Sequence, residues 1–287
     1  MIRNVLLYIA LTLGVVLIGC SDDLPNDKEN GKKEPLSIDV VVSSESIIYN
    51  GVETSILATF SENVDEAVFY FDGVSIGSVI SAPYSVKFTA SDLPPKEYKI
   101  TCVAKVGGES FTGEKSVSVA LRLGDSFQGG KIFQLDTSGK KGLVASATDL
   151  VHIGDFGDEV RFCWGGEGLL GTSIDNGKAN TKLMADASTS PGFAGYHFKG
   201  GGLNLNGYSD WYIPSYRELE VLKENKSLVG GFSTDTDWNA MYWSSSESSE
   251  SSALILNFNV LMGNYDDKGK YYKVRPIRSF DFSDGNS

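Results

Sequence analysis

The stretch GYSDWYIPSYREL, residues 207–219, decides how the C-terminal half of the chain is interpreted. It joins a turn, an aromatic cluster and the start of a helix. Ser215 and Glu218 have the spacing of a capping box, in which each side chain accepts a hydrogen bond from the other residue's amide. Leu219 and Leu222 then recur at helical spacing. The pattern predicts a short amphipathic helix that begins directly after Ser215.

Six further motifs occur in order along the same part of the chain. They are GGKIF (129–133), GLVA (142–145), WG (164–165), GKANT (177–181), YWSSSE (242–247) and VRPIRSF (274–280). Together with residues 207–219 they resemble the Lcl C-terminal domain family, a domain of unknown function, over about residues 124–280. The resemblance implies an outline similar to the C-type-lectin-like fold, in which terminal strands pair and long loops carry binding. The family's collagen-like adhesin implies a role in attachment.

The N-terminus has the form of a lipoprotein signal peptide, predicted to span residues 1–19. Arg3 precedes an apolar run at residues 5–18, which is too short for an ordinary membrane-spanning helix. The run ends at LIGC, a lipobox, so we expect Cys20 to become the first residue of the mature chain. Its thiol and amine would both carry acyl chains, which together anchor a protein stably. An uncleaved anchor with an incidental cysteine is the alternative.

Residues 20–36 form a predicted flexible tether, because they carry many charges and little apolar surface to bury. The acidic pair Asp22 and Asp23 resembles the export signal of lipoproteins that some Gram-negative gut anaerobes display on their surface. Ordinary tether polarity explains the pair equally well. We therefore predict lipid anchoring in the outer membrane, with cell-surface or periplasmic display left open.

The composition fits an exported globular chain of two domains: 287 residues with a net charge of −12. This acidic balance argues against binding nucleic acid, and it limits membrane contact to the N-terminal lipid. Local basic patches stay open around Lys131, Lys140, Lys141 and Lys178, or around Arg275 and Arg278.

Residues 37–122 show a period of two that predicts an all-β sandwich. Seven strands are expected, at 38–42, 55–60, 67–71, 74–80, 84–88, 98–106 and 111–120. Asp72-Gly73 and Gly107-Gly108 have the chemistry of two-residue hairpin turns. The segment resembles bacterial immunoglobulin-like domains, which most often act as spacers.

Residues 123–281 mix strands with short helices, which predicts an α+β domain before a tail at 282–287. A helix is expected after Asp175-Asn176-Gly177, because Ala179, Leu183 and Ala187 recur at helical spacing with Met184 beside them. Strands are expected at 131–135, 142–147 and 253–261. The last strand, 274–280, contains Pro276, which confines it to an edge or a bulge. The fold class is therefore multidomain: an immunoglobulin-like sandwich followed by an α+β, C-type-lectin-like domain.

Apart from Cys20, the chain has two cysteines, Cys102 and Cys163. Cys102 alternates in phase with apolar neighbours, which predicts a buried and inert thiol. Cys163 is expected in the core, although a disulfide between the two stays open. Lectin-like enzymes that oxidise a cysteine in sulfatases rely on paired cysteines, and Cys163 has no such partner within its domain.

Nothing in the sequence combines a nucleophile with a base. His152 and His197 are the only histidines, and the serines 244–246 are expected to cap neighbouring backbone. We therefore predict no enzyme activity and no cofactor. Oxygen donors of the type that calcium prefers occur in two groups, Asp235, Asp237, Asp266 and Asp267, and Asp155, Asp158 and Glu159. Neither matches a calcium-loop signature, so we predict no metal, with a structural calcium left open.

Aromatic, acidic and basic residues of the C-terminal domain are the candidates for ligand binding. They are Tyr208, Asp210, Trp211, Tyr242, Trp243, Tyr265 and Arg275. Trp211 and Trp243 are nevertheless expected to pack in the interior, because motifs shared for folding concentrate large buried side chains. A structural ion pair is the alternative for Asp210 with Arg275. Loops at 155–159, 198–206 and 264–270 are the expected exposed segments.

The sequence thus predicts a lipid-anchored envelope protein in which a sandwich spacer presents a non-catalytic binding domain for a glycan or a host or matrix polymer. One alternative is a structural subunit that binds another envelope protein. A less favoured alternative is an enzyme that processes glycans or modifies sulfatases.

Overall fold

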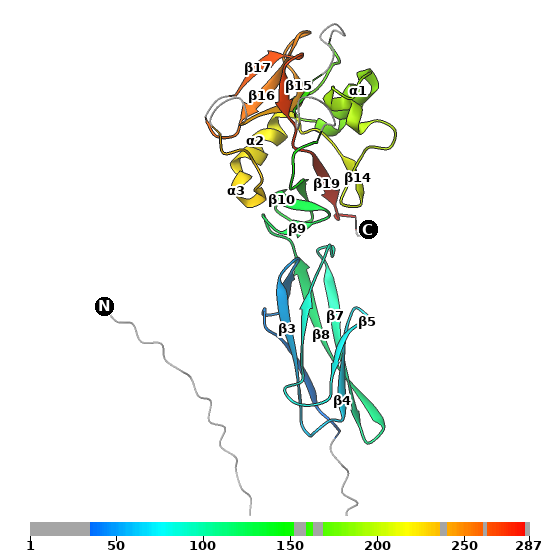
Figure 1. Ribbon diagram of the computed structural model, residues 1–287. Coiled ribbons are helices and arrows are strands. Elements are labelled where there is room, and N and C mark those ends of the chain that lie inside the picture. The colour runs from blue at the N-terminus through cyan, green and yellow to red at the C-terminus, as the bar shows by residue number, and fades with distance from the viewer. Residues whose placement is uncertain (1–34, 152–158, 163–168, 236–239, 261–262, 285–287) are drawn as a thin grey trace, which may run out of the picture. The chain divides into compact units, whose positions relative to one another are not determined.

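A computed structural model describes residues 35–151, 159–162, 169–235, 240–260 and 263–284 (Figure 1). Contacts between residues divide the chain into two compact units, residues 1–35 and 36–287. The predicted signal peptide, Cys20 and residues 20–34 of the tether lie outside the described residues. The described part is mostly β-structure. No helix in it is both long enough and apolar enough to cross a membrane.

Two sheets face each other between residues 38 and 120. The first has the order β1-β3-β6, from β1 (Ile38–Val42), β3 (Glu53–Phe60) and β6 (Ser85–Thr89). The second has the order β2-β8-β7-β4-β5, from β2 (Ile47–Tyr49), β8 (Glu109–Ala120), β7 (Glu97–Val106), β4 (Glu66–Phe71) and β5 (Val74–Val79). This is an immunoglobulin-like sandwich. All seven predicted strands are present.

The eighth strand, β2, was not predicted, because three residues are too few to show a period of two. It pairs in parallel with β8, from Ile47 opposite Ser118 to Tyr49 opposite Ala120. The Asp72-Gly73 turn has positive φ at both residues, +47° and +83°, as the predicted hairpin turn requires.

The strand β7 supplies the alternating core of the sandwich. Tyr98, Ile100, Cys102 and Ala104 are all buried. The Tyr98 hydroxyl donates to the Pro94 carbonyl at 3.1 Å, which is the tyrosine corner of immunoglobulin-like domains. Burial raises the pKa of the Cys102 thiol to about 11, so the prediction of an inert, buried cysteine is confirmed. Cys163 lies outside the described residues.

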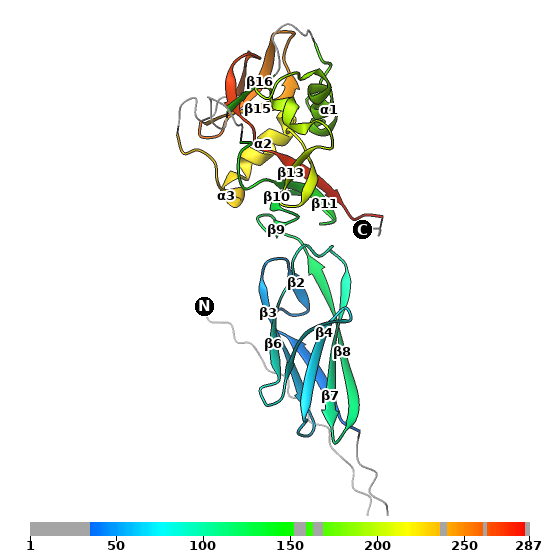
Figure 2. The same ribbon diagram turned by 45° about the vertical axis from the view of Figure 1, so that its right-hand side comes forward.

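The remaining strands form a second group of sheets. A four-stranded sheet has the order β19-β11-β10-β9, from β19 (Ile277–Asp281), β11 (Lys141–Ala145), β10 (Gly130–Leu135) and β9 (Ser126–Phe127), and Figure 2 shows β10 and β11 side by side. The last strand, β19, pairs antiparallel with β11 and begins just after Pro276. A five-stranded sheet has the order β12-β18-β15-β16-β17, from β12 (Glu159–Arg161), β18 (Tyr271–Lys273), β15 (Met241–Glu247), β16 (Ser252–Asn257) and β17 (Gly263–Asp267).

Short helices and a hairpin complete this part of the chain. They are α1 (Gly177–Ala187), the 3₁₀ helix η1 (Ala194–Phe198), α2 (Tyr216–Glu224), α3 (Lys226–Val229) and the hairpin β13 (Leu203–Leu205) with β14 (Tyr208–Trp211). The predicted capping box begins α2. The Ser215 amide donates to Glu218 Oε2 at 2.7 Å, and the Glu218 amide donates to Ser215 Oγ at 3.4 Å.

The buried face of α1 differs from the one that its apolar spacing suggests. Ala179 and Leu183 are exposed, whereas Asn180, Thr181 and Met184 are buried. Hydrogen bonds explain the difference, because a buried polar group is stable when it is bonded. Asn180 Oδ1 accepts from the Ser173 amide at 2.7 Å, and Thr181 Oγ1 accepts from the Ile213 amide at 2.8 Å.

Candidate functional site

Three of the predicted ligand-binding residues are core residues. Tyr242, Trp243 and Arg275 have no exposed surface, so the candidate ligand-binding role is corrected for them. The expected core position of Trp243 is confirmed. Trp243 Nε1 donates to the Val160 carbonyl at 3.0 Å. Its ring packs edge-on against Phe162 and Tyr272.

Arg275 pairs with Asp149 rather than with Asp210. Its Nε donates to Asp149 Oδ1 at 2.6 Å, and its two terminal nitrogens donate to the carbonyls of Ser146, Gly230 and Gly231. Burial raises the pKa of Asp149, although Arg275 acts in the opposite direction. The guanidinium therefore connects its own segment to those at Ser146 and at Gly230 and Gly231. The predicted pairing of Arg275 with Asp210 is wrong.

Asp210 instead binds Arg278 in a bidentate pair. Arg278 Nε and Nη2 lie 2.8 and 3.0 Å from its two carboxylate oxygens. The guanidinium also stacks over the Tyr208 ring, 4.1 Å from its centroid. Both basic residues proposed for a patch at the C-terminus are therefore held by carboxylates.

The serines 244–246 lie in strand β15 and are buried. Ser244 Oγ donates to the Leu254 carbonyl, Ser245 Oγ to the Pro214 carbonyl, and Ser246 Oγ to the Ser173 carbonyl. The predicted backbone-capping role is confirmed, although in a strand and not in a turn.

A second buried ion pair lies in the segment 264–270, which the sequence predicted to be exposed. Lys268 Nζ lies 2.6 Å from Glu247 Oε1, and neither side chain is more than 2% exposed. The Glu247 carboxylate also accepts from the amides of Leu170, Gly171 and Thr172. Burial alone would raise the pKa of Glu247, but these amides and Lys268 outweigh burial and hold it below its usual value. The cluster fixes a loop to the sheet.

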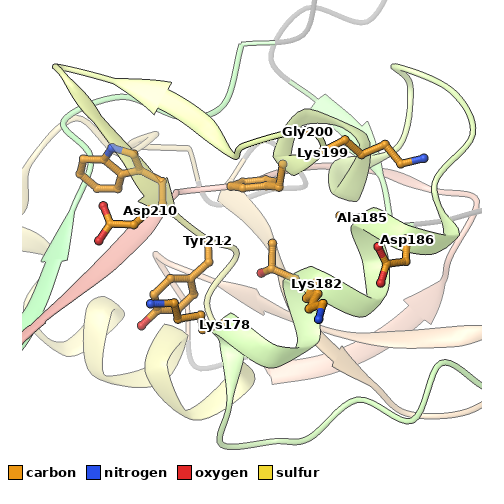
Figure 3. Close-up of a pocket in the computed structure, with 11 residues that line it drawn as sticks. Lys178, Lys182, Ala185, Asp186, Lys199, Gly200, Asp210 and Tyr212 are labelled. Carbon is orange, nitrogen blue, oxygen red and sulfur yellow. The ribbon is translucent and has the colours of Figure 1, made fainter.

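Two of the predicted binding residues, Asp210 and Trp211, line the same cleft, whose volume is about 400 Å³. Three segments of the C-terminal part form its walls (Figure 3). The lining residues are Lys178, Thr181, Lys182, Ala185 and Asp186 of α1, Phe198 at the end of η1 with Lys199 and Gly200 after it, and Asp210 and Trp211 at the end of β14 with Tyr212 after it. We call this the α1 cleft. Tyr265, 60% exposed, and Tyr208 do not line it.

The α1 cleft combines an aromatic floor with charged walls. Trp211 and Tyr212 are each 3% exposed, so they offer the cleft only a small surface. The indole Nε1 donates to the Leu205 carbonyl at 3.1 Å, which fixes the ring. Burial raises the pKa of Tyr212 above its usual value, and Glu218 adds to this effect, so its hydroxyl stays protonated.

The lysines of the α1 cleft differ in their freedom. Lys199 Nζ donates to the Ser188 carbonyl. Lys178 and Lys182 are exposed and lie one turn apart on α1, and within the described residues neither has a hydrogen bond or an ion pair. Asp210 is already bound to Arg278, and Asp186, the other acid of the cleft, has no ion pair within the described residues. Two ammonium groups that likewise have no ion pair there therefore line the cleft.

A glycine loop forms one rim of the α1 cleft. Gly200, Gly201 and Gly202 all have positive φ, at +65°, +118° and +88°, a conformation that side-chain-bearing residues rarely adopt. A Cβ at Gly202 would lie 2.1 Å from the Ser209 carbonyl oxygen. The loop can therefore approach β14 only because this position is glycine.

The predicted loop 198–206 supplies Phe198, Lys199 and Gly200 to the cleft, whereas sequence reasoning missed Lys182 and Asp186. Lys178 and Lys182 stand at i and i+4 on the predicted helix, which could have indicated one wall. The opposite wall comes from residues 198–212, and no local pattern brings it to the helix. Among the residues that the structure describes, no group of three or more His, Cys, Asp or Glu side chains could hold a metal ion. His152, Asp155, Asp158 and Asp237 lie outside those residues.

The fold and the α1 cleft define a mostly β chain in which an immunoglobulin-like sandwich precedes an α+β part with a small surface cleft. No family model and no curated protein matches the chain. Solved structures match in part. The fibronectin(III)-like modules of Clostridium thermocellum CbhA are 24% identical, with a TM-score of 0.24, over 29% of this chain and 94% of that chain.

Two β-glucuronidases are also similar in part. The β-glucuronidase 2 of Bacteroides uniformis is 13% identical to this chain, with a TM-score of 0.25. The β-glucuronidase of Parabacteroides merdae is 17% identical, also with a TM-score of 0.25. The matches cover 32% and 39% of this chain but only 11% and 15% of those enzymes. At such scores the similarities carry no argument about function.

Proposed function

We propose that the protein is a lipid-anchored protein of the cell envelope whose C-terminal domain binds a glycan or a host or matrix polymer without catalysis. The immunoglobulin-like sandwich serves as the spacer. The α1 cleft is the observation that carries this proposal. Its floor is aromatic, and its free ammonium groups can bind hydroxyl or acidic groups of a ligand.

The resemblance to the Lcl C-terminal family and the C-type-lectin-like outline support the same function. The pairing of β19 with β11 agrees with the terminal pairing that this outline implies. The lipid anchor rests on the sequence of residues 1–20 alone. Attachment to an outer membrane, with or without surface exposure, is part of the proposal.

A glycan array tests the proposal directly. The chain from residue 21 onward is applied with and without a chelator, and we expect binding to a small set of glycans in both conditions. Replacing Lys178 and Lys182 together with alanine should weaken that binding about tenfold, or about 1.4 kcal/mol. A double replacement of Lys140 and Lys270, which are exposed and outside the cleft, removes the same charge and should leave binding unchanged.

Two results would redirect the proposal. Silence across the array, together with co-purification of another envelope protein, would favour a structural subunit. Turnover of an array glycan would favour the enzyme alternative. Equal losses in the two double variants would show that net charge, and not the α1 cleft, controls binding.

A further inference from the structure

A second groove shares no lining residue with the α1 cleft. It has a volume of about 740 Å³ and lies between α2, the start of α3 and the end of β16. Its lining residues are Tyr216, Arg217, Glu220, Val221, Lys223, Glu224, Lys226, Leu256, Phe258, Asn259 and Val260. We call it the α2 groove. The walls are apolar where β16 ends and charged along the helix.

Two lysines of the α2 groove reach the same short segment. Lys223 Nζ donates to the Val260 carbonyl at 2.7 Å, and Lys226 Nζ donates to the Phe258 carbonyl and to Asn259 Oδ1. Asn257 Oδ1 fixes this segment by accepting from the amides of Asn259 and Val260. Both amines are therefore held at defined positions close to one another.

Burial and a neighbouring cation both weaken the protonated form of Lys223. Burial lowers the pKa of Lys223, and the Lys226 ammonium lowers it further, whereas Glu220 opposes both effects. The other charged groups lining the groove, Arg217 and Glu224, lie on the same helix. The opposing wall of residues 256–260 contributes no titratable side chain. A lysine that is partly desolvated and next to a second cation is the arrangement that activates an amine as a nucleophile.

We propose that Lys223 is a nucleophilic lysine that forms an imine with small aldehydes entering the α2 groove. The neutral amine adds to the carbonyl carbon, and the carbinolamine then loses water. One amine and one aldehyde thus give one imine and one water, with no oxidant or reductant. The apolar wall of Leu256, Phe258 and Val260 favours an aldehyde with an apolar or aromatic body. This site is independent of the glycan-binding proposal.

Reductive trapping measures the reaction. The full chain is treated at neutral pH with limiting benzaldehyde and cyanoborohydride, and the modified lysines are identified by peptide mass spectrometry. We expect Lys223 to react faster than the exposed Lys182, because a lowered pKa leaves a larger fraction of the amine neutral. In Lys223→Arg, modification at this position disappears while modification of Lys182 is unchanged.

Two charge variants test whether the neighbouring charges control the reactivity of Lys223. Lys226→Gln removes the neighbouring cation and should slow labelling of Lys223, whereas Glu220→Gln removes the opposing anion and should accelerate it. The Glu220 arm stays informative even if Lys226→Gln unfolds the groove, since Glu220 has no structural partner among the described residues. Even labelling of all lysines, or a Lys223 rate that Glu220→Gln leaves unchanged, would overturn the proposal.

Discussion

Replacing Arg275 with methionine should strongly destabilise the C-terminal part of the chain. The side chain is fully buried and makes four hydrogen bonds, one of them to the carboxylate of Asp149. It also lies 4.0 Å from the centre of the Phe232 ring. Methionine keeps much of the volume but leaves Asp149 as a buried, unpaired charge. Breaking one side of such a pair costs about 3 to 5 kcal/mol.

A pH series separates the charge from the packing. Burial already raises the pKa of Asp149 above its ordinary value near 3.8, and loss of Arg275 should raise it further. A carboxyl group with a raised folded-state pKa destabilises the fold above that pKa, and it recovers stability as pH falls toward the unfolded value. The deficit of Arg275→Met relative to the wild type should therefore shrink between pH 7 and pH 4.5.

Denaturant unfolding followed by tryptophan fluorescence suits this test. All four tryptophans, at 164, 211, 238 and 243, lie outside the sandwich, so the signal reports on the C-terminal part alone. Adding Asp149→Asn to Arg275→Met should recover about 2 kcal/mol, because the unpaired charge is gone while the three carbonyls stay unbonded. Arg278→Met is the control; its partner Asp210 is 41% exposed, so the loss should be smaller. The reasoning fails if Arg275→Met unfolds at the wild-type denaturant concentration, or if Asp149→Asn recovers nothing.

Three further substitutions and one labelling experiment test other parts of the structure. Ser215→Ala removes the capping hydroxyl of α2 and should lower the unfolding free energy by about 1 kcal/mol, read from the fluorescence midpoint; an unchanged midpoint would mean that the cap contributes nothing. Glu247→Gln should flatten the loss of stability below about pH 4.5, because a carboxylate with a lowered folded-state pKa stabilises the fold above its unfolded pKa and loses that effect on acidification; an equally steep acid limb in the variant would contradict this. Tyr98→Phe should cost about 1 kcal/mol in the sandwich, measured by circular dichroism, and a neutral result would show that the tyrosine corner is dispensable. Cys102 should resist a thiol reagent at pH 8 until the chain unfolds, since its pKa is about 11; rapid labelling of the folded chain at this residue would show that it opens.

The sandwich was predictable because the sequence patterns that mark its strands and turns are local. Alternation along β7 alone marks Tyr98, Ile100 and Cys102 as inward, and the paired turn residues mark where strands end. The helix α2 was equally local, since Ser215 and Glu218 are three residues apart. In α1 the same reasoning gave the right helix, but the apolar spacing does not mark its buried face. Hydrophobicity ranked Leu183 above Asn180, but distant partners at Ser173 and Ser245 make the amide the better buried group.

The candidate site was less predictable, because its contacts are long-range. Arg275 and Asp149 are 126 residues apart, and nothing in either neighbourhood marks them as partners. The sequence suggested Asp210 as the partner of Arg275, but Asp210 forms its ion pair with Arg278. The aromatic residues of the core were better predicted, since the interior position expected for Trp243 is what the structure has, whereas Tyr242 was predicted only as a binding residue. Only the folded structure shows that Asp210 and Trp211 line the same cleft as the lysines of α1.

The parallel pairing of β2 with β8 has a mechanical consequence for the spacer and N-terminal lipid anchor that we propose. A pull along the chain draws β2 backward and β8 forward, so the two strands are loaded in opposite directions along their length. The hydrogen bonds from Ile47 opposite Ser118 to Tyr49 opposite Ala120 then bear the force in shear, all together and not one after another. A spacer built in this way yields abruptly at high load instead of unzipping under weak flow.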